Sequence, residues 1–534
     1  MVELETDVLV VGGGLGGVAA ALAAARSGRR VVLTEQYAWL GGQLTSQAVP
    51  PDEHRWVEQF GTTRSYRELR EGIRRYYRQN YPLTQRARRW RELNPGAGAV
   101  SKLCHEPRVA VAVLEAMLAP YRSSGRLRVL QPYVPMAATV DGDRVTSVTV
   151  RQPDAGDEVV ITAPYVLDAT ETGELLPPTG CEYVTGFESS AETGEPSAPD
   201  EPQPLNMQAV SVCFAVDHVD GNHTIDKPGS YDSWRTYQPD FWGAPLLSWV
   251  APSTRSRRAE RRIFDPNPDD DPQGIQADLS QEGGDVNLWT FRRIAARKNF
   301  VDGSYDSDIT LVNWPMIDYF VGPVIEVPDA AHHLAQAREL SLSFLYWMQT
   351  EAPRPDGGTG FRGLRLRSDV TGSHDGLAMA PYIRESRRIQ AQYTIVEQDL
   401  SLAVRGQRGA VTYPDSVGIG MYRIDLHPST GGDNYIDIGA SPFQIPLGAL
   451  LPRRLTNLVA ASKNIGTTHI TNGCYRLHPV EWNVGEVAGM LAAHCLSSGK
   501  QPTQVRTEAE EPRIFQQLLV ADGIELAWPQ VAGY

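Results

Sequence analysis

The sequence is poor in the features that mark secreted, metal-binding and membrane proteins. Its 534 residues include only five cysteines, which are scattered and form no Cys-x-x-Cys pair. That spacing indicates neither a disulfide framework nor a zinc site, and we expect no bound metal. No apolar run reaches the ~20 residues that a membrane-spanning helix needs. No charged leader with an apolar core precedes Val8, so we expect a cytoplasmic protein.

The sequence also has fewer basic residues than acidic ones. There are 50 lysines and arginines against 64 acidic residues, which gives a formal net charge of −14. An acidic protein attracts neither nucleic acid nor an anionic membrane, so we expect neither as a partner. The chain is too long for one compact core, which predicts two interleaved domains. Oligomeric state stays open, with a homo-oligomer as one option.

The most informative feature is a strand, turn, helix and strand at the start of the chain. An apolar strand over residues 8–11 leads into a glycine turn and an alanine-rich helix, and a second strand over 31–34 ends at Glu35. In this arrangement Gly12 allows the tight turn, Gly14 lets the backbone approach phosphate closely, and Gly17 permits close packing of helix on strand. The free N–H groups and positive end of the helix favour an anion. The Glu35 carboxylate is placed to accept hydrogen bonds from a ribose diol, so the segment predicts a dinucleotide site.

Further elements follow from apolar patterning. A helix is expected over 108–118, followed by a strand over 127–130 and an antiparallel pair, 144–150 with 159–162, around the turn Asp141-Gly142. The segment 165–173 is predicted to be a short apolar strand that ends in small residues and a glycine. Later we expect helices over 331–350 and 382–402, strand-like segments over 418–426 and 435–438, and a strand over 458–460 before a helix over 484–495. The second glycine triplet, 358–363, has no strand before it and is predicted to be a loop. We therefore expect no separate NAD(P)H domain.

An arginine stripe lies on the basic helical segment 55–95. Arg67, Arg70, Arg74 and Arg78 recur at helical spacing, interleaved with acids. One interpretation is a clamp for phosphate or carboxylate. We favour the other, a solvated or subunit-facing stripe with internal ion pairs.

Four segments together resemble a known family. They are the turn 12–17 with Glu35, the pair Gly41-Gly42, the strand end 168–174, and the closing segment 457–489 with its Thr468-His469 and Arg476-Leu477-His478-Pro479. In this order they are similar to the FAD-dependent oxidoreductase superfamily with the glutathione-reductase type of nucleotide fold. More narrowly, the chain resembles the bacterial group labelled "FAD-dependent oxidoreductase". Glu171 stands where that family often has glycine.

The resemblance implies an α/β fold, a Rossmann-like FAD-binding domain with an interleaved α+β substrate domain. The FAD-binding domain would take residues 1–50, 100–180 and 410–500, with a helical excursion over 51–99. Residues 187–405 would form the substrate or cap domain and 501–534 a C-terminal tail. The implied FAD contacts are Gly12, Gly14, Leu15, Gly16, Gly17, Glu35, Gln36, Gly41, Gly42, Gln43, Ala169, Thr170, Gly173, Asn483, Val484 and Gly485.

The last three of these contacts depend on a second helix. A helix that begins near Asn483, Val484 and Gly485 would direct its positive end at the flavin pyrimidine and stabilise the reduced ring. The alternative is that Gly485 and Gly489 only permit close helix packing.

Three residues of the closing segment are candidates for catalysis. His469 and His478 suit the base that removes a proton while hydride leaves the substrate, and Arg476 suits a substrate carboxylate or a polarised oxygen. His427 is a further, weaker candidate for the base. For each residue a structural hydrogen bond or ion pair is the alternative.

The resulting hypothesis is an FAD-dependent dehydrogenase or oxidase. It would move hydride from a C–OH or C–N carbon of a small polar or natural-product substrate to flavin N5. An NAD(P)H-dependent flavin monooxygenase is the alternative, and a non-catalytic flavin-binding partner protein is a third hypothesis.

Overall fold

The fold is built on a parallel sheet of five strands. The computed structural model describes residues 2–268 and 287–533. In spatial order the strands are β23 (Leu458–Ala460), β8 (Tyr165–Asp168), β2 (Val8–Val11), β3 (Val31–Thr34) and β4 (Leu127–Leu130). All four pairings are parallel. Because helices cover both faces of such a sheet, its strands are continuous apolar runs. The sheet confirms the predicted α/β class.

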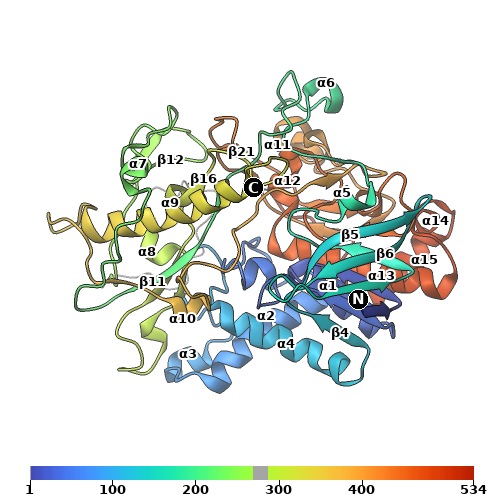
Figure 1. Ribbon diagram of the computed structural model, residues 1–534, viewed down its shortest axis with the longest axis horizontal. Helices are drawn as coiled ribbons and strands as arrows, with labels where there is room; N and C mark the ends of the chain where they lie inside the picture. The colour runs from blue at the N-terminus through green and yellow to red at the C-terminus, as the bar shows by residue number, and fades with distance from the viewer. Residues whose placement is uncertain (1, 269–286, 534) are drawn as a thin grey trace.

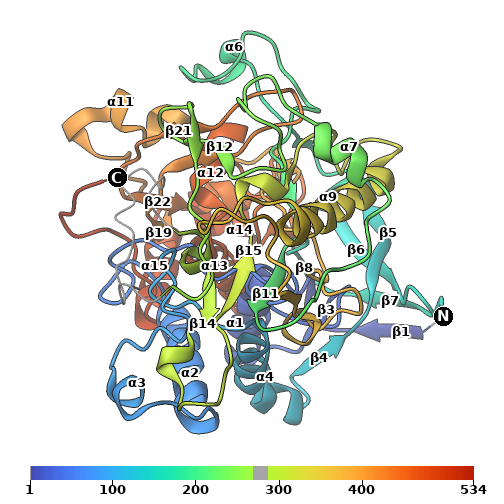
Figure 2. The ribbon, with the colours of Figure 1, turned by 90° about the vertical axis from the view of Figure 1, so that its left-hand side faces the viewer.

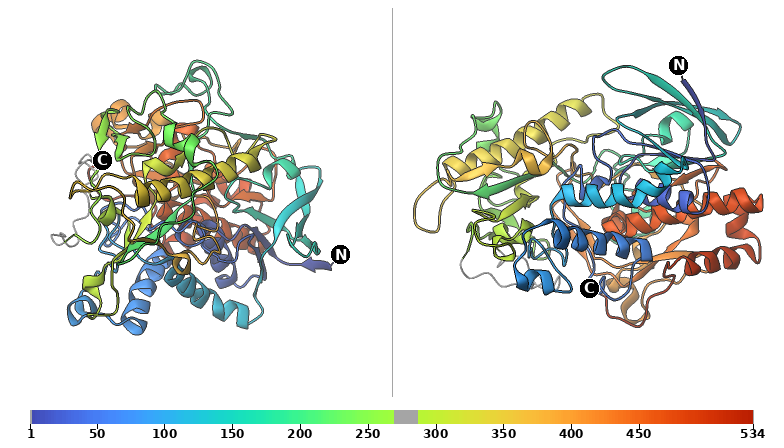
Figure 3. Two further views of the ribbon diagram at one scale, coloured as in Figure 1. Left: turned by 60° about the vertical axis from the view of Figure 1, so that its left-hand side comes forward. Right: turned by 90° about the horizontal axis from the view of Figure 1, so that it is seen from below.

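Two helices from opposite ends of the chain pack together against this sheet. They are α1 (Leu15–Arg26) and α13 (His478–Ser498), drawn blue and red side by side in Figure 1. On the far side of α1 lies α4 (Pro107–Ser123), which packs on α2 (Arg64–Asn80), as the right-hand view of Figure 3 shows. The beginning and the end of the chain therefore build one layer together.

The helix α13 begins earlier than the sequence predicted. Its first residue is His478, with Leu477 as the N-cap, whereas the apolar pattern predicted a start near Asn483. Pro479 follows in the first turn, where its missing N–H would have no partner within the helix in any case. The proline therefore marks the start of the helix, and His478 lies in it and not in a loop before it.

A second sheet flanks the first. Its order is β1 (Val2–Glu5), β7 (Glu158–Thr162), β6 (Arg144–Arg151) and β5 (Val134–Asp141). The predicted antiparallel pair β6–β7 is present, but the turn at Asp141-Gly142 joins β6 to β5, a strand that the sequence did not predict. In β5 most side chains are partly or fully exposed, so its apolar signal is weak.

A separate hydrophobic core lies within the predicted substrate domain. It draws only on residues between Ala209 and Ile383, with the long helix α9 (Ala330–Thr350) against it, as predicted (Figure 1, yellow). Its sheet has the order β14 (Arg293–Ala295), β15 (Ile309–Val312), β11 (Phe214–His218) and β17 (Leu364–Leu366). The predicted loop 358–363 connects α9 to β17. Residues 269–286 of the predicted substrate domain lie outside the described residues.

Shorter elements complete both parts. Around the second core these are β10 (Val210–Ser211), α7 (Tyr231–Thr236), β12 (Val250–Pro252), β13 (Ala259–Arg261), α8 (Leu288–Phe291), β16 (Asp318–Tyr319) and α10 (Ser368–Thr371). Toward the C-terminus they are β19 (Ser416–Gly420), β20 (Ile424–Leu426), β21 (Ile436–Ile438), β22 (Phe443–Pro446), α12 (His469–Tyr475), α14 (Pro502–Thr507) and α15 (Glu511–Ala521). Elsewhere are α3 (Gln85–Arg89), α5 (Leu176–Thr179), β9 (Tyr183–Val184), α6 (Ser190–Thr193) and α11 (Leu402–Arg405). Figure 2 shows α12 and α15 on the same side as β19 and β22.

The helix predicted over residues 382–402 is wrong. This segment is extended, with the short strand β18 (Arg388–Ile389) paired to β9 and a single 3-10 turn over Glu397–Asp399. Its Arg384, Glu385 and Arg388 are all buried and bind polar groups on different sides of the segment. Tertiary contacts override the local helical pattern here.

The arginine stripe on α2 is not a solvated face. Arg70 and Arg74 are buried, and both pair with Glu58; Arg70 also pairs with Glu53. Arg74 makes the expected pair with Glu71 within the helix as well. The ion-pair part of the prediction is confirmed, but its main partners precede the helix, and burial makes these pairs part of the interior.

Within the part of the chain that the structure describes, no helix combines the length and the apolarity needed to cross a membrane.

Candidate dinucleotide and substrate site

The glycine turn after β2 has the geometry that the sequence predicted. Gly12 has φ +97°, and a Cβ on it would overlap the Ala169 carbonyl at the end of β8. A Cβ on Gly17 would overlap the Gly12 carbonyl, and one on Gly16 would overlap the Ala461 carbonyl after β23. Each glycine therefore permits a backbone contact that no other residue allows. Two neighbouring strand ends are held against the turn in this way.

Glu35 ends β3 beside that turn. Its carboxylate accepts hydrogen bonds from the backbone N–H groups of Gly13 and Tyr37, each at 2.8 Å. Burial outweighs these two bonds and raises the pKa of Glu35 to about 8. The carboxyl group therefore closes the turn and, without a ligand, is mainly protonated near neutral pH.

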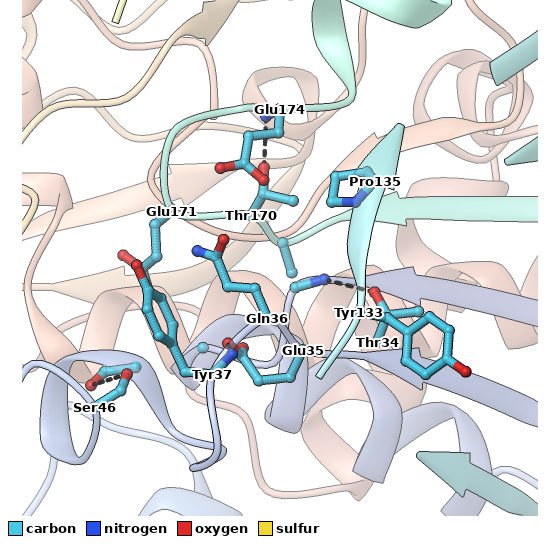
Figure 4. A pocket seen from close by; sticks show the side chains of 14 residues that line it. Thr34, Glu35, Gln36, Tyr37, Ser46, Tyr133, Pro135, Thr170, Glu171 and Glu174 are labelled. Carbon is cyan, nitrogen blue, oxygen red and sulfur yellow. Dashed lines mark hydrogen bonds between the residues drawn. The ribbon is translucent and has the colours of Figure 1, made fainter. Parts of the chain in front are cut away.

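A small, partly open cavity lies at the carboxyl ends of β2, β3 and β8 (Figure 4). Its walls are formed by Gly12, Gly14, Thr34, Glu35, Gln36, Tyr37, Gly42, Ser46, Tyr133, Pro135, Ala169, Thr170, Glu171 and Glu174. This is where ligands bind in parallel α/β sheets. Of the predicted cofactor contacts, the cavity brings together Gly12, Gly14, Glu35, Gln36, Gly42, Ala169 and Thr170.

The remaining predicted contacts lie outside this wall. Leu15, Gly16 and Gly17 continue into α1. Gly41 precedes the 3-10 turn over Gly42–Leu44, and the amide of Gln43 donates to the Arg476 carbonyl at 3.1 Å and to Glu481. Gly173 has φ +67° and faces Arg387. Tyr37, Tyr133 and Glu174 line the cavity and were missed, since nothing in their local spacing marks them.

The Glu171 carboxylate lies at the start of α1. Its Oε1 is 2.6 Å from a Cβ built on either Gly14 or Gly42, so it fills the gap between the two glycines. That oxygen is buried and has no hydrogen-bond partner, while Oε2 pairs with the buried ammonium of Lys463. The positive end of α1 thus already holds a negative oxygen, at the place predicted for a diphosphate. Neither Glu171 nor Lys463 was predicted as a contact.

Asn483, Val484 and Gly485 serve helix packing in this structure. They lie inside α13, away from its first turn, and a Cβ on Gly485 would overlap the Gly16 carbonyl of α1. Gly489 meets Ala20 in the same way, and the Asn483 amide donates to the Val417 carbonyl at 3.2 Å. The geometry corresponds to the packing alternative, because the helix begins at His478.

His469 is held by a buried carboxylate. It opens α12, and its Nδ1 lies 2.9 Å from Glu385 Oε2. The neighbouring His469 and Arg388 side chains lower the pKa of Glu385 to about 2, in spite of its burial. Glu385 is therefore ionised, and it orients the imidazole with Nδ1 as the donor. Sequence spacing could not show this partner, which comes from the segment wrongly predicted to be a helix.

His478 has a different environment. Its Nδ1 accepts a hydrogen bond from the Asp52 backbone N–H at 3.1 Å, so the proton of the neutral ring lies on Nε2. Burial lowers its pKa to about 3. A ring in this state donates from Nε2 and does not accept a proton near neutral pH. The geometry therefore favours His469 over His478 as the base.

The other two candidates join a buried polar cluster. Arg476 ends α12, where its Nη1 lies 3.4 Å from the Tyr382 hydroxyl and its Nη2 lies 3.5 Å from Asp425 Oδ2. His427 Nδ1 lies 2.6 Å from the fully buried Asp318 carboxylate. Among the described residues, no group of three or more His, Cys, Asp or Glu is placed to hold a metal ion.

The parallel sheet, the glycine turn and the cavity at its edge define a dinucleotide-binding α/β protein. The model of the family "FAD dependent oxidoreductase" matches residues 7–519, nearly the whole chain. The chain therefore belongs to the FAD-dependent oxidoreductases, and the protein is an enzyme whose cofactor is FAD. A comparison with curated proteins finds no match.

Several solved structures are distantly similar. L-proline dehydrogenase from P. horikoshii is 15% identical over 35% of this chain and 25% of its own, with a TM-score of 0.19. A geranylgeranyl bacteriochlorophyll reductase-like protein from Thermoplasma acidophilum is 11% identical over 98% of this chain and 85% of its own, with a TM-score of 0.31. Glycerol-3-phosphate dehydrogenase from Bacillus halodurans is 14% identical over 40% of each chain, with a TM-score of 0.23. Matches at these scores say nothing about substrate.

The residues present fit FAD. The glycine gap at the start of α1 already accommodates a carboxylate oxygen, and the adjoining cavity has polar and aromatic walls suited to an adenosine. Lys463 is the cation beside that gap. A diphosphate in this gap would have to displace the Glu171 carboxylate.

Proposed function

We propose that this enzyme oxidises a C–OH or C–N carbon of a small polar or natural-product substrate, with His469 as the base. Bound FAD supplies the hydride acceptor for this chemistry. The observation that carries the proposal is the buried pair of His469 with the ionised Glu385. We further propose that residues 187–405 enclose the substrate and that the reaction takes place in the cytoplasm.

Each residue then has a definite task. Glu385 holds the Nδ1 proton of His469, which leaves Nε2 to take the proton from the substrate hydroxyl or amine. Glu385 also stabilises the imidazolium that forms. We assign Arg476 to orienting the substrate and the Nε2–H of His478 to donating a hydrogen bond to it; both side chains are buried.

The test is reduction of the bound flavin without oxygen. Purified holoenzyme is mixed anaerobically with a panel of alcohols and amines, and bleaching of the visible flavin band is followed in time. We expect one class to reduce the flavin without NAD(P)H, and His469→Gln to slow reduction by about 10²- to 10⁴-fold, the usual contribution of a general base. His374→Gln, which changes an exposed histidine, is the matched control.

Two outcomes would contradict the proposal. If the flavin is reduced only by NAD(P)H, and labelled O₂ then enters a product, the enzyme is a monooxygenase. If His469→Gln keeps full FAD content and an unchanged reduction rate, His469 is not the base.

A further inference from the structure

A buried cluster of polar side chains lies between the two parts of the fold. Its members come from both: Arg292 and Tyr382 lie in the predicted substrate domain, while Asp52, Arg476 and His478 lie outside it. Tyr382, Arg476 and His478 are at most 3% exposed. Boundaries between two domains are common places for small-molecule sites.

Several donors in this cluster make no hydrogen bond. They are Arg292 Nε and Nη1, Arg476 Nε and His478 Nε2, all of them buried, although Arg292 Nη1 is ion-paired with Asp52 and the Val49 backbone lies beside the His478 ring. The His478 ring carries its proton on Nε2, because Nδ1 accepts from the Asp52 backbone. Buried donors are rarely left unpaired, because desolvating them without a hydrogen bond is costly. This set of donors calls for a group that only accepts.

These donors are linked through shared neighbours. Arg292 Nη1 is 3.3 Å from Asp52 Oδ1, and the backbone N–H of Asp52 donates to His478. The Tyr382 phenol meets Arg476 at 3.4 Å and also lies within range of the Asp52 and Arg292 charges. His478 and Tyr382 further interact with Lys463, the cation beside the glycine turn. The cluster therefore adjoins the cofactor site.

From these contacts we propose that Arg292, Arg476 and His478 bind a carboxylate of the substrate, so that the substrate is a small organic acid. A carboxylate has two acceptor oxygens and no donor, and guanidinium groups bind it in two-pronged geometry. Asp52 and Asp425 already face the two arginines and offset their charge, which disfavours a doubly charged phosphate. The inference rests on the proposed oxidation and names its substrate class.

The experiment measures binding and does not depend on turnover. Holoenzyme is titrated with non-oxidisable pairs, propionate with propionamide and benzoate with benzamide, and with inorganic phosphate, while the visible flavin spectrum is recorded. We expect each acid to perturb the spectrum at lower concentration than its amide and than phosphate. Arg292→Gln should raise the dissociation constant of the acids by about 10- to 100-fold, the range for a hydrogen bond to a charged group, and leave that of the amides unchanged.

Controls separate binding from folding. Arg365→Gln removes a half-exposed arginine that pairs with Asp217, and Asp217 stays paired with Arg367 in this variant. This control should leave the dissociation constants of acids and amides unchanged. Arg292→Lys keeps the charge and should restore part of the affinity for acids. If Arg292→Gln does not fold, the test uses two other measurements: acid binding by Arg292→Lys, and the comparison of acid with amide binding by the wild-type enzyme.

The results also distinguish this inference from the proposed function. Equal binding of acid and amide, or acid binding that Arg292→Gln leaves intact, overturns the carboxylate site. If neutral alcohols or amines reduce the flavin while acids do not bind, the oxidation stands and the carboxylate site fails. If acids bind but no C–OH or C–N compound reduces the flavin, the carboxylate site stands and the oxidation fails.

Discussion

Replacing Glu171 by glutamine should tighten the binding of FAD. The Glu171 carboxylate lies between Gly14 and Gly42 and pairs with Lys463. If the FAD diphosphate occupies the same gap, as we predict, FAD must displace that carboxylate and break the pair. Glutamine removes the competing charge and leaves Lys463 with only Glu481, at 3.8 Å. The apoprotein then loses an interaction that the FAD complex does not have.

The size of the effect follows from the burial of the pair. Removing one partner of a fully buried ion pair costs about 3–5 kcal/mol. The Glu171 side chain is 13% exposed and Glu481 remains near Lys463, so we take a value below this range, about 2 kcal/mol. At about 1.4 kcal/mol per tenfold, this predicts apoprotein that is less stable by about 2 kcal/mol and FAD affinity that is about 30-fold higher.

The assay compares variants stripped of cofactor. FAD is titrated into each apoprotein while flavin fluorescence is followed, and the unfolding of each apoprotein is measured in urea. Glu174→Gln is the matched control, because Glu174 lines the same cavity but contacts Thr172 and not Lys463. Glu171→Gln that binds FAD no more tightly than wild type would refute the reasoning.

Two further predictions concern α13 and the turn. Gly485→Ala should lower the free energy of unfolding by about 3 kcal/mol, because its methyl group would overlap the Gly16 carbonyl. Gly229→Ala, whose methyl group would make only an ordinary contact with Glu339 at 3.9 Å, should leave that energy unchanged in the same urea titration. Glu35 has a pKa of about 8 in the folded apoprotein against 4.5 ordinarily, so its stabilising contribution is present at low pH and is lost as pH rises through 8. Between about pH 5 and about pH 9, wild-type apoprotein should therefore lose on the order of 4 kcal/mol relative to Glu35→Gln. A constant difference between the two across this range would mean that Glu35 does not titrate there.

Local order along the chain was enough to predict the dinucleotide turn. The strand over 8–11, the spaced glycines and Glu35 are close in sequence, so short-range sterics decide their geometry. The long helix over 330–350 follows from its own apolar content in the same way. Family membership and FAD also follow from four ordered segments, and the match over residues 7–519 confirms both.

Interactions between distant segments were decided only by the tertiary structure. Glu171 meets Lys463, His469 meets Glu385, and Arg292 meets Asp52, and in each pair the partners are far apart in the chain. Contacts between distant segments also explain why the helix predicted over 382–402 is wrong, because the charged residues of that segment are buried against several neighbours. The local pattern of apolar residues indicates which face of a segment is buried. It does not indicate which buried charged residue that segment will contact. Pairing, burial and protonation of the site therefore depend on the folded chain.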